Sequence, residues 1–264
     1  MSKSCIKAMY VINGGYMDID KGLMTANTDI GKWIKIPVPV FLLDTTEGYV
    51  MIDTGMNPQV IDDPVPCWGE WLAQDVPVHM TTENDFRTVF EKMGVKLEDI
   101  KYVINTHMHH DHLGGNRFFP NATHIVQKDE YRFAICPDDG FSARYTLHSD
   151  LPEQLNWKLI EGECEVLPGI VLIPTPGHSP GHQSILLKDV PGVGNLVYCG
   201  DAVYMKENWE KEIGPGICWN PPLAIKSMLK LKQIADLTDS YVFVSHDWDY
   251  FNTLPMAPEK FTVK

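Results

Sequence analysis

Long apolar runs, positive charge and closely spaced cysteines are all scarce in this sequence. No apolar run approaches the roughly 20 residues of a membrane-spanning helix, and residues 1–5 are not followed by the apolar core of a secretory signal. The six cysteines are scattered without a CxxC pair, which argues against a disulfide framework and against a cysteine-based zinc site. We therefore expect a cytoplasmic protein without a membrane segment.

The shortage of positive charge also limits the partners. The chain has 22 lysines and arginines against 35 aspartates and glutamates, which is a formal net charge of −13. Because this field repels phosphate and no basic cluster counteracts it, nucleic acids and anionic membranes are poor partners. The content of 44% hydrophobic and 22% charged residues is that of an ordinary globular protein. Since no linker interrupts the chain, we predict a single domain over residues 1–264.

Histidine, in contrast, is concentrated in one stretch, residues 106–115. If residues 101–105 form a strand and the chain leaves it extended, alternation of side chains points His107 and His109 to the same side. Two glycines then favour a turn. Within it Asp111 and His112 are adjacent, so this second pair of side chains can face a point next to the one that His107 and His109 face. Imidazole and carboxylate suit zinc and other late divalent ions. The stretch therefore predicts ligands for two metal ions.

His110 has the opposite strand parity, so we expect it to line a pocket rather than to bind metal. A similar kind of donor follows three later strands: His178 lies in a loop rich in Gly and Pro, and Asp201 and His246 end apolar runs. The role of His182, which lies in the same loop as His178, stays open between support of a ligand and a purely structural role. His148 stands alone, and we assign it a structural role.

Hydrophobic periodicity predicts strands and helices in alternation, with hairpins between them. The turn signal at residues 13–15 is expected to end the first strand. Such a mixture favours an α/β fold of two mostly antiparallel sheets, packed face to face with helices outside. The predicted strands are 7–11, 37–43, 49–53, 102–104, 123–127, 157–160, 164–166, 170–173, 196–199 and 241–244, and the predicted helices are 81–93 and 129–135.

Residues 56–80 show neither a helical nor a strand period and are rich in Pro, Asp and Trp. A connection this long is usually functional, so we expect an irregular lid or substrate loop that carries Trp68 and Trp71. The alternative is that these two rings cover the core.

The motif His107-x-His109-x-Asp111-His112, with single donors downstream, resembles the metallo-β-lactamase superfamily. The resemblance implies an αββα sandwich with a metal centre at one edge. It also implies two metal sites joined by one bridging carboxylate. The implied ligands are His107, His109 and His178 for one metal and Asp111, His112 and His246 for the other, with Asp201 between them.

Local features narrow the resemblance to the N-acyl homoserine lactone hydrolases, the quorum-quenching lactonases. These are residues 52–55, the His-rich turn, residues 175–184, and Tyr204 three positions after the bridging carboxylate. The resemblance implies that Tyr204 acts at the scissile carbonyl. His110 stands where relatives can carry an aromatic residue, which makes it a candidate for acyl-chain preference.

The expected mechanism uses two divalent metal ions, with zinc the first choice and iron, cobalt or manganese as alternatives. Two adjacent ions lower the pKa of a shared water, so that hydroxide attacks the lactone carbonyl of a small-molecule substrate. Tyr204 would stabilise the oxyanion and Asp111 would pass a proton to the departing ring oxygen.

Other readings stay open. A lactonase for another ring uses the same residues, whereas a glyoxalase II-like thioesterase would need a basic site that the sequence lacks, and Tyr204 counts against it. A non-catalytic metal or redox sensor is disfavoured because no ligand is missing, and an oxygen-reducing di-iron relative would usually carry an acidic residue in place of His109. Acyl-chain length, the native metal and a homodimeric state are not determined by the sequence.

Overall fold

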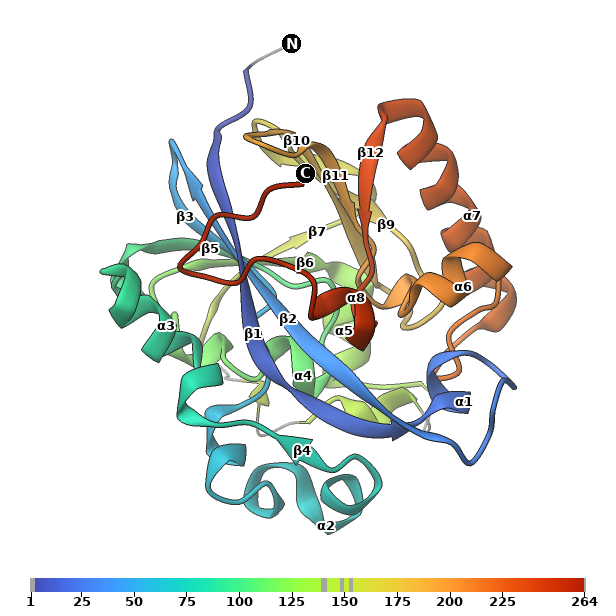
Figure 1. The fold of residues 1–264 in the computed structure, drawn as a ribbon. Coiled ribbons are helices and arrows are strands. Elements are labelled where there is room, and N and C mark those ends of the chain that lie inside the picture. The colour runs from blue at the N-terminus through green and yellow to red at the C-terminus, as the bar shows by residue number, and fades with distance from the viewer. Residues whose placement is uncertain (1–2, 139–141, 148–149, 152–153, 264) are drawn as a thin grey trace.

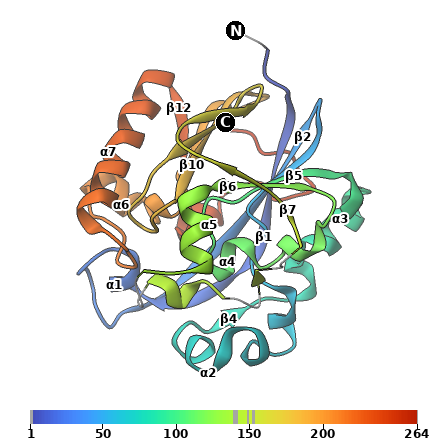
Figure 2. The same cartoon turned by 180° about the vertical axis from the view of Figure 1, so that it is seen from behind.

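The computed structural model describes residues 3–138, 142–147, 150–151 and 154–263. Two sheets face each other, and helices cover their outer sides (Figures 1 and 2). The first sheet has the strand order β4-β1-β2-β3-β5-β6-β7, and the second has the order β12-β11-β10-β9-β8. This arrangement confirms the predicted fold class, an α/β sandwich of two sheets.

The first sheet is half antiparallel and half parallel. Strands β4, β1, β2 and β3 pair antiparallel, whereas β3, β5, β6 and β7 pair parallel through crossovers. The strands are β1 (Ile6–Asp20), β2 (Trp33–Thr45), β3 (Gly48–Ile52), β4 (Val78–His79), β5 (Ile100–Ile104), β6 (Thr123–Gln127) and β7 (Asn156–Ile160).

The first strand does not end at residues 13–15, so the turn predicted there is wrong. Strand β1 continues through 15 residues to Asp20, with a register shift between Asn13 and Tyr16. Gly15 has φ +98°, and a Cβ on Gly14 would come within 2.8 Å of the Val38 carbonyl oxygen. The two glycines therefore form a bulge in a long strand.

The second sheet is antiparallel except at one edge, where β12 pairs parallel with β11. The pattern of the sequence did not single out β10, whose residues are almost all buried and show no alternation. The strands are β8 (Cys164–Leu167), β9 (Ile170–Pro174), β10 (Gln183–Val190), β11 (Gly194–Tyr198) and β12 (Ser240–Phe243).

Helix α3 matches its prediction except at its start. The segment Thr82–Asn84 is a separate 3-10 turn, and the helix begins after Asp85, whose side chain accepts the Arg87 N–H. The longest helix, α7, was not predicted, although Asn220 followed by two prolines is a start signal. The helices are α1 (Lys21–Met24), α2 (Val65–Asp75), α3 (Phe86–Met93), α4 (His110–Leu113), α5 (Lys128–Ile135), α6 (Lys206–Lys211), α7 (Pro221–Thr238) and α8 (Trp248–Phe251).

Residues 56–80 contain regular secondary structure, which the sequence pattern did not indicate, and their role as a lid or substrate segment stays a prediction. They form a 3-10 turn at Pro58–Ile61, helix α2 and the short strand β4. Helix α2 is kinked at Gly69, which has φ +78°. Because the kink divides the helix into two short pieces, neither is long enough to show a helical period in the sequence.

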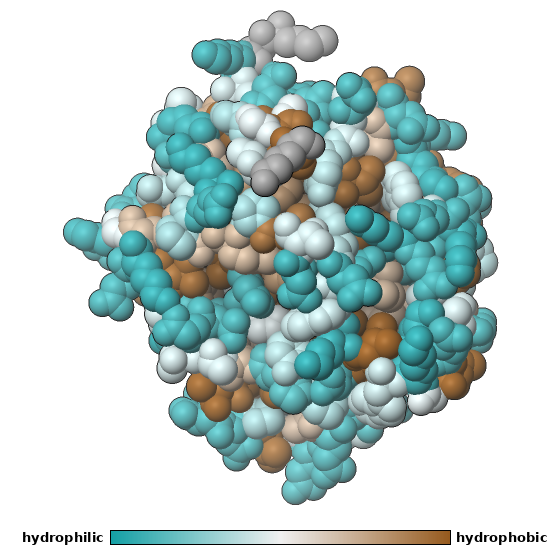
Figure 3. Space-filling view, in the orientation of Figure 1, coloured by the Kyte–Doolittle hydropathy of each residue, from teal (hydrophilic) through white to brown (hydrophobic). Residues whose placement is uncertain are grey.

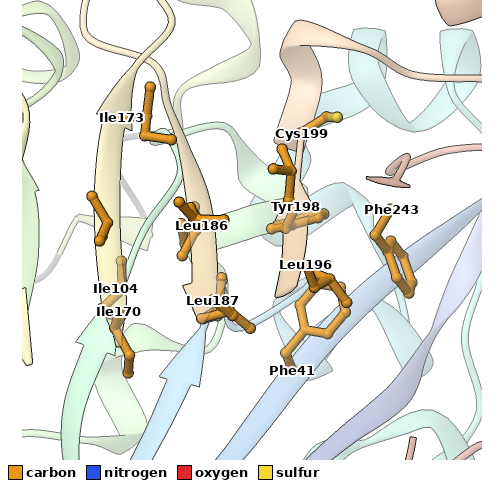
Figure 4. Close-up of a cluster of buried hydrophobic side chains, with 14 of the residues drawn as sticks. Phe41, Ile104, Ile170, Ile173, Leu186, Leu187, Leu196, Tyr198, Cys199 and Phe243 are labelled. Carbon is orange, nitrogen blue, oxygen red and sulfur yellow. The ribbon is translucent and has the colours of Figure 1, made fainter. Parts of the chain in front are cut away.

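The largest part of the hydrophobic core lies between the two sheets. Phe41 and Ile104 of the first sheet belong to one buried cluster with Leu186 and Leu196 of the second (Figure 4). Polar side chains cover most of the outer face seen in Figure 3, where apolar ones form small separate areas. Among the described residues, no helix combines the length and apolar character needed to cross a membrane.

Candidate metal centre

Seven buried histidine and aspartate side chains come together in two adjacent groups. Each segment that supplies them directly follows a strand, namely β5, β9, β11 or β12. All seven donors that the sequence predicted as ligands are present. The first group is His107, His109, His178 and Asp201, and the second group is Asp111, His112 and His246.

In the first group, three imidazole nitrogens converge. His178 Nε2 lies 3.1 Å from His107 Nε2 and 2.9 Å from His109 Nδ1. Asp201 Oδ2 is 3.6 Å from His107 Nε2 and 3.5 Å from His178 Nε2. Three nitrogens and one carboxylate oxygen around a single point match the donor set of a zinc-type site.

The second group contains more carboxylate. Asp111 Oδ2 lies 3.4 Å from His112 Nε2 and 3.7 Å from His246 Nε2. The other oxygen of Asp201, Oδ1, lies 3.4 Å from His112 Nε2 and 3.2 Å from His246 Nε2. The two oxygens of Asp201 thus face different groups, which is the geometry of a bridging carboxylate.

Four of the five histidines direct Nε2 into the groups and hold Nδ1 against an oxygen. Such outer hydrogen bonds fix ring orientation and tautomer in metal-binding histidines. The partners are Thr106 Oγ1 for His107 (3.0 Å), Asp53 Oδ2 for His112 (2.8 Å), the Ile217 carbonyl for His178 (2.9 Å) and the Pro37 carbonyl for His246 (2.8 Å).

Some buried polar atoms of the two groups make no hydrogen bond within the described part of the chain. They include His112 Nε2 and Asp201 Oδ1, whose mutual contact lacks hydrogen-bond geometry, and His109 Nε2. Leaving such atoms unpaired costs roughly 1–3 kcal/mol each. A cation beside His112 Nε2 and Asp201 Oδ1 would remove that cost, so the residues present fit metal ions.

The first group contains neutral imidazoles. Burial lowers the pKa of His107, His109 and His178 below the usual histidine value, and it outweighs the pull of Asp201. Their lone pairs are therefore free to bind a metal, because a neutral imidazole is the ligand form.

The second group favours positive charge. Burial by itself lowers the pKa of His112 and His246, but the adjacent carboxylates outweigh it and both pKa values are raised. For Asp111 and Asp201 burial raises the pKa, yet the facing imidazoles lower it well below its usual range. A divalent cation would supply the same positive charge by displacing protons.

Asp53 supports the His-rich turn through hydrogen bonds. The structure buries this carboxylate completely. Its carboxylate accepts the N–H and the hydroxyl of Thr106 at 2.7 and 2.8 Å and contacts His112 Nδ1. Asp53 therefore contacts the His-rich turn at Thr106, near its start, and at His112, near its end.

Sequence reasoning missed Glu130, on α5, which connects the two main donor loops. Its Oε1 accepts the Met108 N–H at 2.9 Å, and its Oε2 accepts the Ser179 hydroxyl at 2.6 Å and the Gly181 N–H at 3.0 Å. The side chain is 1% exposed. No feature of the sequence distinguished Glu130 from the other acidic residues of an amphipathic helix.

His182 lies outside both groups. Its Nε2 accepts the Asp201 backbone N–H at 2.9 Å, and its Nδ1 is 2.9 Å from the Thr175 hydroxyl. Burial lowers the pKa of His182 to about 3, so the ring is neutral and can accept that hydrogen bond. Of the two alternatives for His182, these contacts favour support of the turn that contains Asp201. His148 lies outside the described residues.

A cavity opens beside the two groups and is lined by both polar and apolar side chains. Donors of both groups line it together with His110 and Tyr204, and the rest of its lining is Met17, Ile19, Met24, Ile36, Val76, Tyr145 and Ile217.

Tyr204 places its hydroxyl 3.0 Å from His178 Nδ1. Burial raises the pKa of Tyr204 well above its usual value, so the phenol keeps its proton. Trp68 and Trp71 do not line the cavity. Trp68 packs against His110, and Trp71 is 42% exposed near Tyr145.

Comparison with known proteins agrees with this geometry. The family model of the metallo-beta-lactamase superfamily matches residues 34–246. An N-acyl homoserine lactonase of Bacillus thuringiensis is 34% identical over 254 residues, covering 96% of this chain and 98% of the relative. The N-acyl homoserine lactonase AttM of Azorhizobium caulinodans is 32% identical over 257 residues, covering 95% and 97%.

Solved structures give the same result. An N-acyl homoserine lactone hydrolase with N-hexanoyl-L-homoserine bound at its catalytic metal centre aligns with a TM-score of 0.87 at 32% identity. The alignment covers 97% of this chain and 99% of the other. A variant of B. thuringiensis AiiA with N-decanoyl-L-homoserine at its active site aligns equally well, at 0.87. The chain therefore belongs to the metallo-β-lactamase superfamily and, within it, to the family of the N-acyl homoserine lactonases.

Proposed function

We propose that this protein hydrolyses the lactone ring of N-acyl homoserine lactones with two divalent metal ions and so destroys quorum-sensing signals. The observation that carries the proposal is Asp201, whose two oxygens face two separate donor groups beside one cavity. Related hydrolases hold N-hexanoyl-L-homoserine at a catalytic metal centre and N-decanoyl-L-homoserine at an active site. This supports a substrate that combines a lactone with an acyl chain.

The proposed ligands are three histidines for one ion and Asp111, His112 and His246 for the other, with Asp201 shared. Mixed imidazole and carboxylate donors favour zinc over magnesium or calcium, and iron, cobalt or manganese also fit them. Two such ions, when bound, acidify a water molecule and polarise a carbonyl oxygen. The remaining steps depend on side chains of this chain.

Tyr204 is proposed to stabilise the negative charge that develops on the lactone carbonyl oxygen. Its phenol is buried at the cavity wall and keeps its proton, as the raised pKa requires. A donor held in place before the reaction needs no reorganisation when charge appears, which makes it effective.

Asp111 is proposed to transfer the proton. Its pKa is held well below the usual range by His112 and His110, which outweigh burial, so the carboxylate is charged before the reaction. Asp111 also lines the cavity. It can therefore take a proton from the attacking water and deliver it to the ring oxygen as the C–O bond breaks.

The apolar wall of the cavity is proposed to hold the acyl chain. Met17, Ile19, Met24 and Ile36 belong to the apolar part of its lining. Apolar pockets with few polar groups are typical of small-molecule sites. Two other expectations stay predictions: a homodimer, and a cytoplasmic location, with which six free cysteines agree.

The test combines metal analysis with a substrate panel. Metal content is measured by elemental analysis, and acid release is followed with a pH indicator on acyl homoserine lactones, simple lactones and glutathione thioesters. We expect two ions per chain and fastest hydrolysis of the acyl homoserine lactones. Two ions without hydrolysis of any panel member would contradict the proposal, and preference for thioesters would replace it with a thioesterase.

A further inference from the structure

Three buried side chains, Ser184, Thr175 and His182, form a hydrogen-bonded network that begins and ends on the segment carrying Asp201. Thr175 follows β9, Ser184 lies in β10, and Cys199 follows β11, and these strands are neighbours in the second sheet (Figure 1). The Ser184 hydroxyl donates to the Cys199 carbonyl at 2.7 Å and lies 2.8 Å from the Thr175 hydroxyl. Thr175 Oγ1 is 2.9 Å from His182 Nδ1, and His182 Nε2 accepts the Asp201 N–H at 2.9 Å. The network therefore holds the backbone on both sides of Gly200.

The two ends of the network determine the direction of each hydrogen bond in it. A backbone N–H only donates, so His182 Nε2 carries no proton and the neutral ring has its proton on Nδ1. A carbonyl oxygen only accepts, so the single proton of Ser184 is used on Cys199. Thr175 must then donate to Ser184 and accept from His182 Nδ1. The two hydroxyls thus fix the tautomer of His182.

Gly200 allows His182 to approach the backbone of Asp201. It has φ +53°, and a Cβ at this position would lie 2.7 Å from His182 Nε2. The His182 ring also lies next to the first donor group, with its centroid 5.2 Å from that of His107. Because its Nε2 is used on the backbone, His182 acts on the metal centre through Asp201 and not as a further ligand.

The contact matters for both donor groups because the carboxylate of Asp201 serves both. Its Oδ2 lies 3.6 Å from His107 Nε2, and its Oδ1 lies 3.2 Å from His246 Nε2. A rotation of the backbone at Asp201 would move both oxygens together. The network is therefore placed to control how well Asp201 reaches the two groups at once.

We propose, building on the bridging role of Asp201 in the function above, that Thr175 and Ser184 are positioning residues of the metal centre. They hold His182 in the tautomer that accepts the Asp201 N–H, and this bond fixes the carboxylate between the two groups. Loss of either hydroxyl should consequently weaken both metal sites, although neither hydroxyl touches a ligand side chain of the two groups directly.

The test measures the affinity for both ions by competition with a chelator. Thr175→Val keeps the approximate shape of the side chain but removes the acceptor for His182 Nδ1, so the opposite tautomer, which repels the Asp201 N–H, becomes accessible. We expect the affinity for both ions to fall roughly 10- to 100-fold, the range for losing a residue that orients a metal ligand. Thr175→Ser restores the hydroxyl and should bind both ions as the wild type does. Ser184→Ala leaves the Thr175 oxygen in place and should have a smaller effect.

Substitutions of His182 test the other end of the network. His182→Leu removes the acceptor, whereas His182→Gln can place an accepting oxygen near the position of Nε2. We expect His182→Gln to bind both ions more tightly than His182→Leu does. The visible absorption of the Co²⁺-loaded protein gives an independent readout, because it depends on the donors around each ion. His182→Leu should change the bands of both ions, since Asp201 is shared.

Two buried side chains outside the donor groups provide matched controls. The Thr45 hydroxyl donates to the Gly48 carbonyl at 2.6 Å, and His124 Nε2 lies 2.9 Å from the Phe119 carbonyl oxygen. Both side chains are buried, and neither belongs to a donor group or lines the cavity. Thr45→Val and His124→Leu should lower the melting temperature of the metal-free protein and leave metal affinity unchanged.

Several outcomes would overturn the proposal. They are unchanged metal affinity in Thr175→Val, loss of affinity at only one of the two sites, and a Thr175→Ser variant that binds as weakly as Thr175→Val. Each leaves the lactonase function intact, whereas a wild type that binds two ions and hydrolyses no lactone would refute that function without changing the affinities. If Thr175→Val fails to fold, Ser184→Ala and the two His182 variants decide.

Discussion

The two donor groups share Asp201 but differ in chemistry. The first has three histidines whose pKa values burial lowers, so it is neutral apart from the shared carboxylate. The second has two histidines with raised pKa values opposite Asp111 and Asp201. The first group therefore offers free lone pairs, whereas in the second a metal ion must compete with protons. We therefore expect metal binding by the second group to depend more on the negative charge of its carboxylates than metal binding by the first group does.

The largest effect is expected from Asp201→Asn, which removes the charge that both groups share. We expect metal content to fall below one ion per chain and kcat/KM to fall at least roughly 10³-fold, because each site loses its bridging ligand. Elemental analysis and lactone hydrolysis measure the two quantities. Asp189→Asn, at an exposed position of strand β10 with φ +52°, is the matched control and should change neither. Normal metal content in Asp201→Asn would refute the bridging role.

Substitutions of single histidines test the two donor groups separately. His178→Ala removes a ligand of the first group only, and His246→Ala removes one of the second only. Each variant should keep about one ion per chain and lose roughly 10²-fold or more in kcat/KM. Metal affinity of His178→Ala, which reports the second site, should weaken more steeply as the pH falls. Identical pH profiles of metal affinity in the two variants would contradict the proposed difference in protonation between the two groups.

Tyr204→Phe should spare both groups while slowing the reaction. The phenyl ring keeps its place in the core, and only the hydroxyl that lies 3.0 Å from His178 Nδ1 is lost. Loss of one preorganised donor to an oxyanion lowers kcat roughly 10²-fold. Metal analysis should still give two ions per chain. Loss of an ion instead would make the hydroxyl a support for His178 and not a catalytic group.

Glu130→Gln tests whether the two main donor loops depend on one buried carboxylate. An amide keeps one accepting oxygen and replaces the other with a donor, so Met108 N–H or the Ser179 and Gly181 donors lose their acceptor. We expect metal affinity of the first group to fall about tenfold, with a smaller effect on the second. Competition with a chelator measures both affinities. A fall in thermal stability with unchanged metal affinity would limit Glu130 to a structural role.

The structure brings together the seven residues that the sequence singled out, and each follows an apolar strand, which is a local pattern visible in the sequence. The sequence could not predict what the structure adds around them. The burial of Asp53 depends on strand β5 packing beside β3, and the contacts of Glu130 depend on how α5 lies across two loops. Helix α2 escaped prediction because Gly69 breaks its period. A local pattern thus identifies the clustered histidine and aspartate residues better than it identifies the residues that support them.

The smallest effect concerns Asp150, a buried carboxylate outside both groups. Its Oδ1 accepts from Asn57 at 2.8 Å and from Arg117 at 3.0 Å, while Oδ2 makes no hydrogen bond with the described residues. Burial outweighs both contacts and raises the pKa of Asp150 to about 6, the opposite of the shift at Asp111. Burial alone therefore does not determine the charge of a carboxylate in this fold; the facing imidazoles do.

The sign of the resulting pH dependence follows from that shift. A carboxyl whose pKa is raised in the folded state loses stability as the pH rises from its ordinary value of 3.8 through about 6. Asp150→Asn keeps an oxygen at the Oδ1 position and cannot ionise. It should therefore raise the free energy of unfolding above pH 7 by less than about 3 kcal/mol, and by little below pH 4. Urea unfolding at the two pH values measures the difference. An equal stabilisation at both pH values would show that Arg117 compensates the charge of Asp150. In that case burial would not separate the pKa values of Asp150 and Asp111, and only the imidazoles that face Asp111 would.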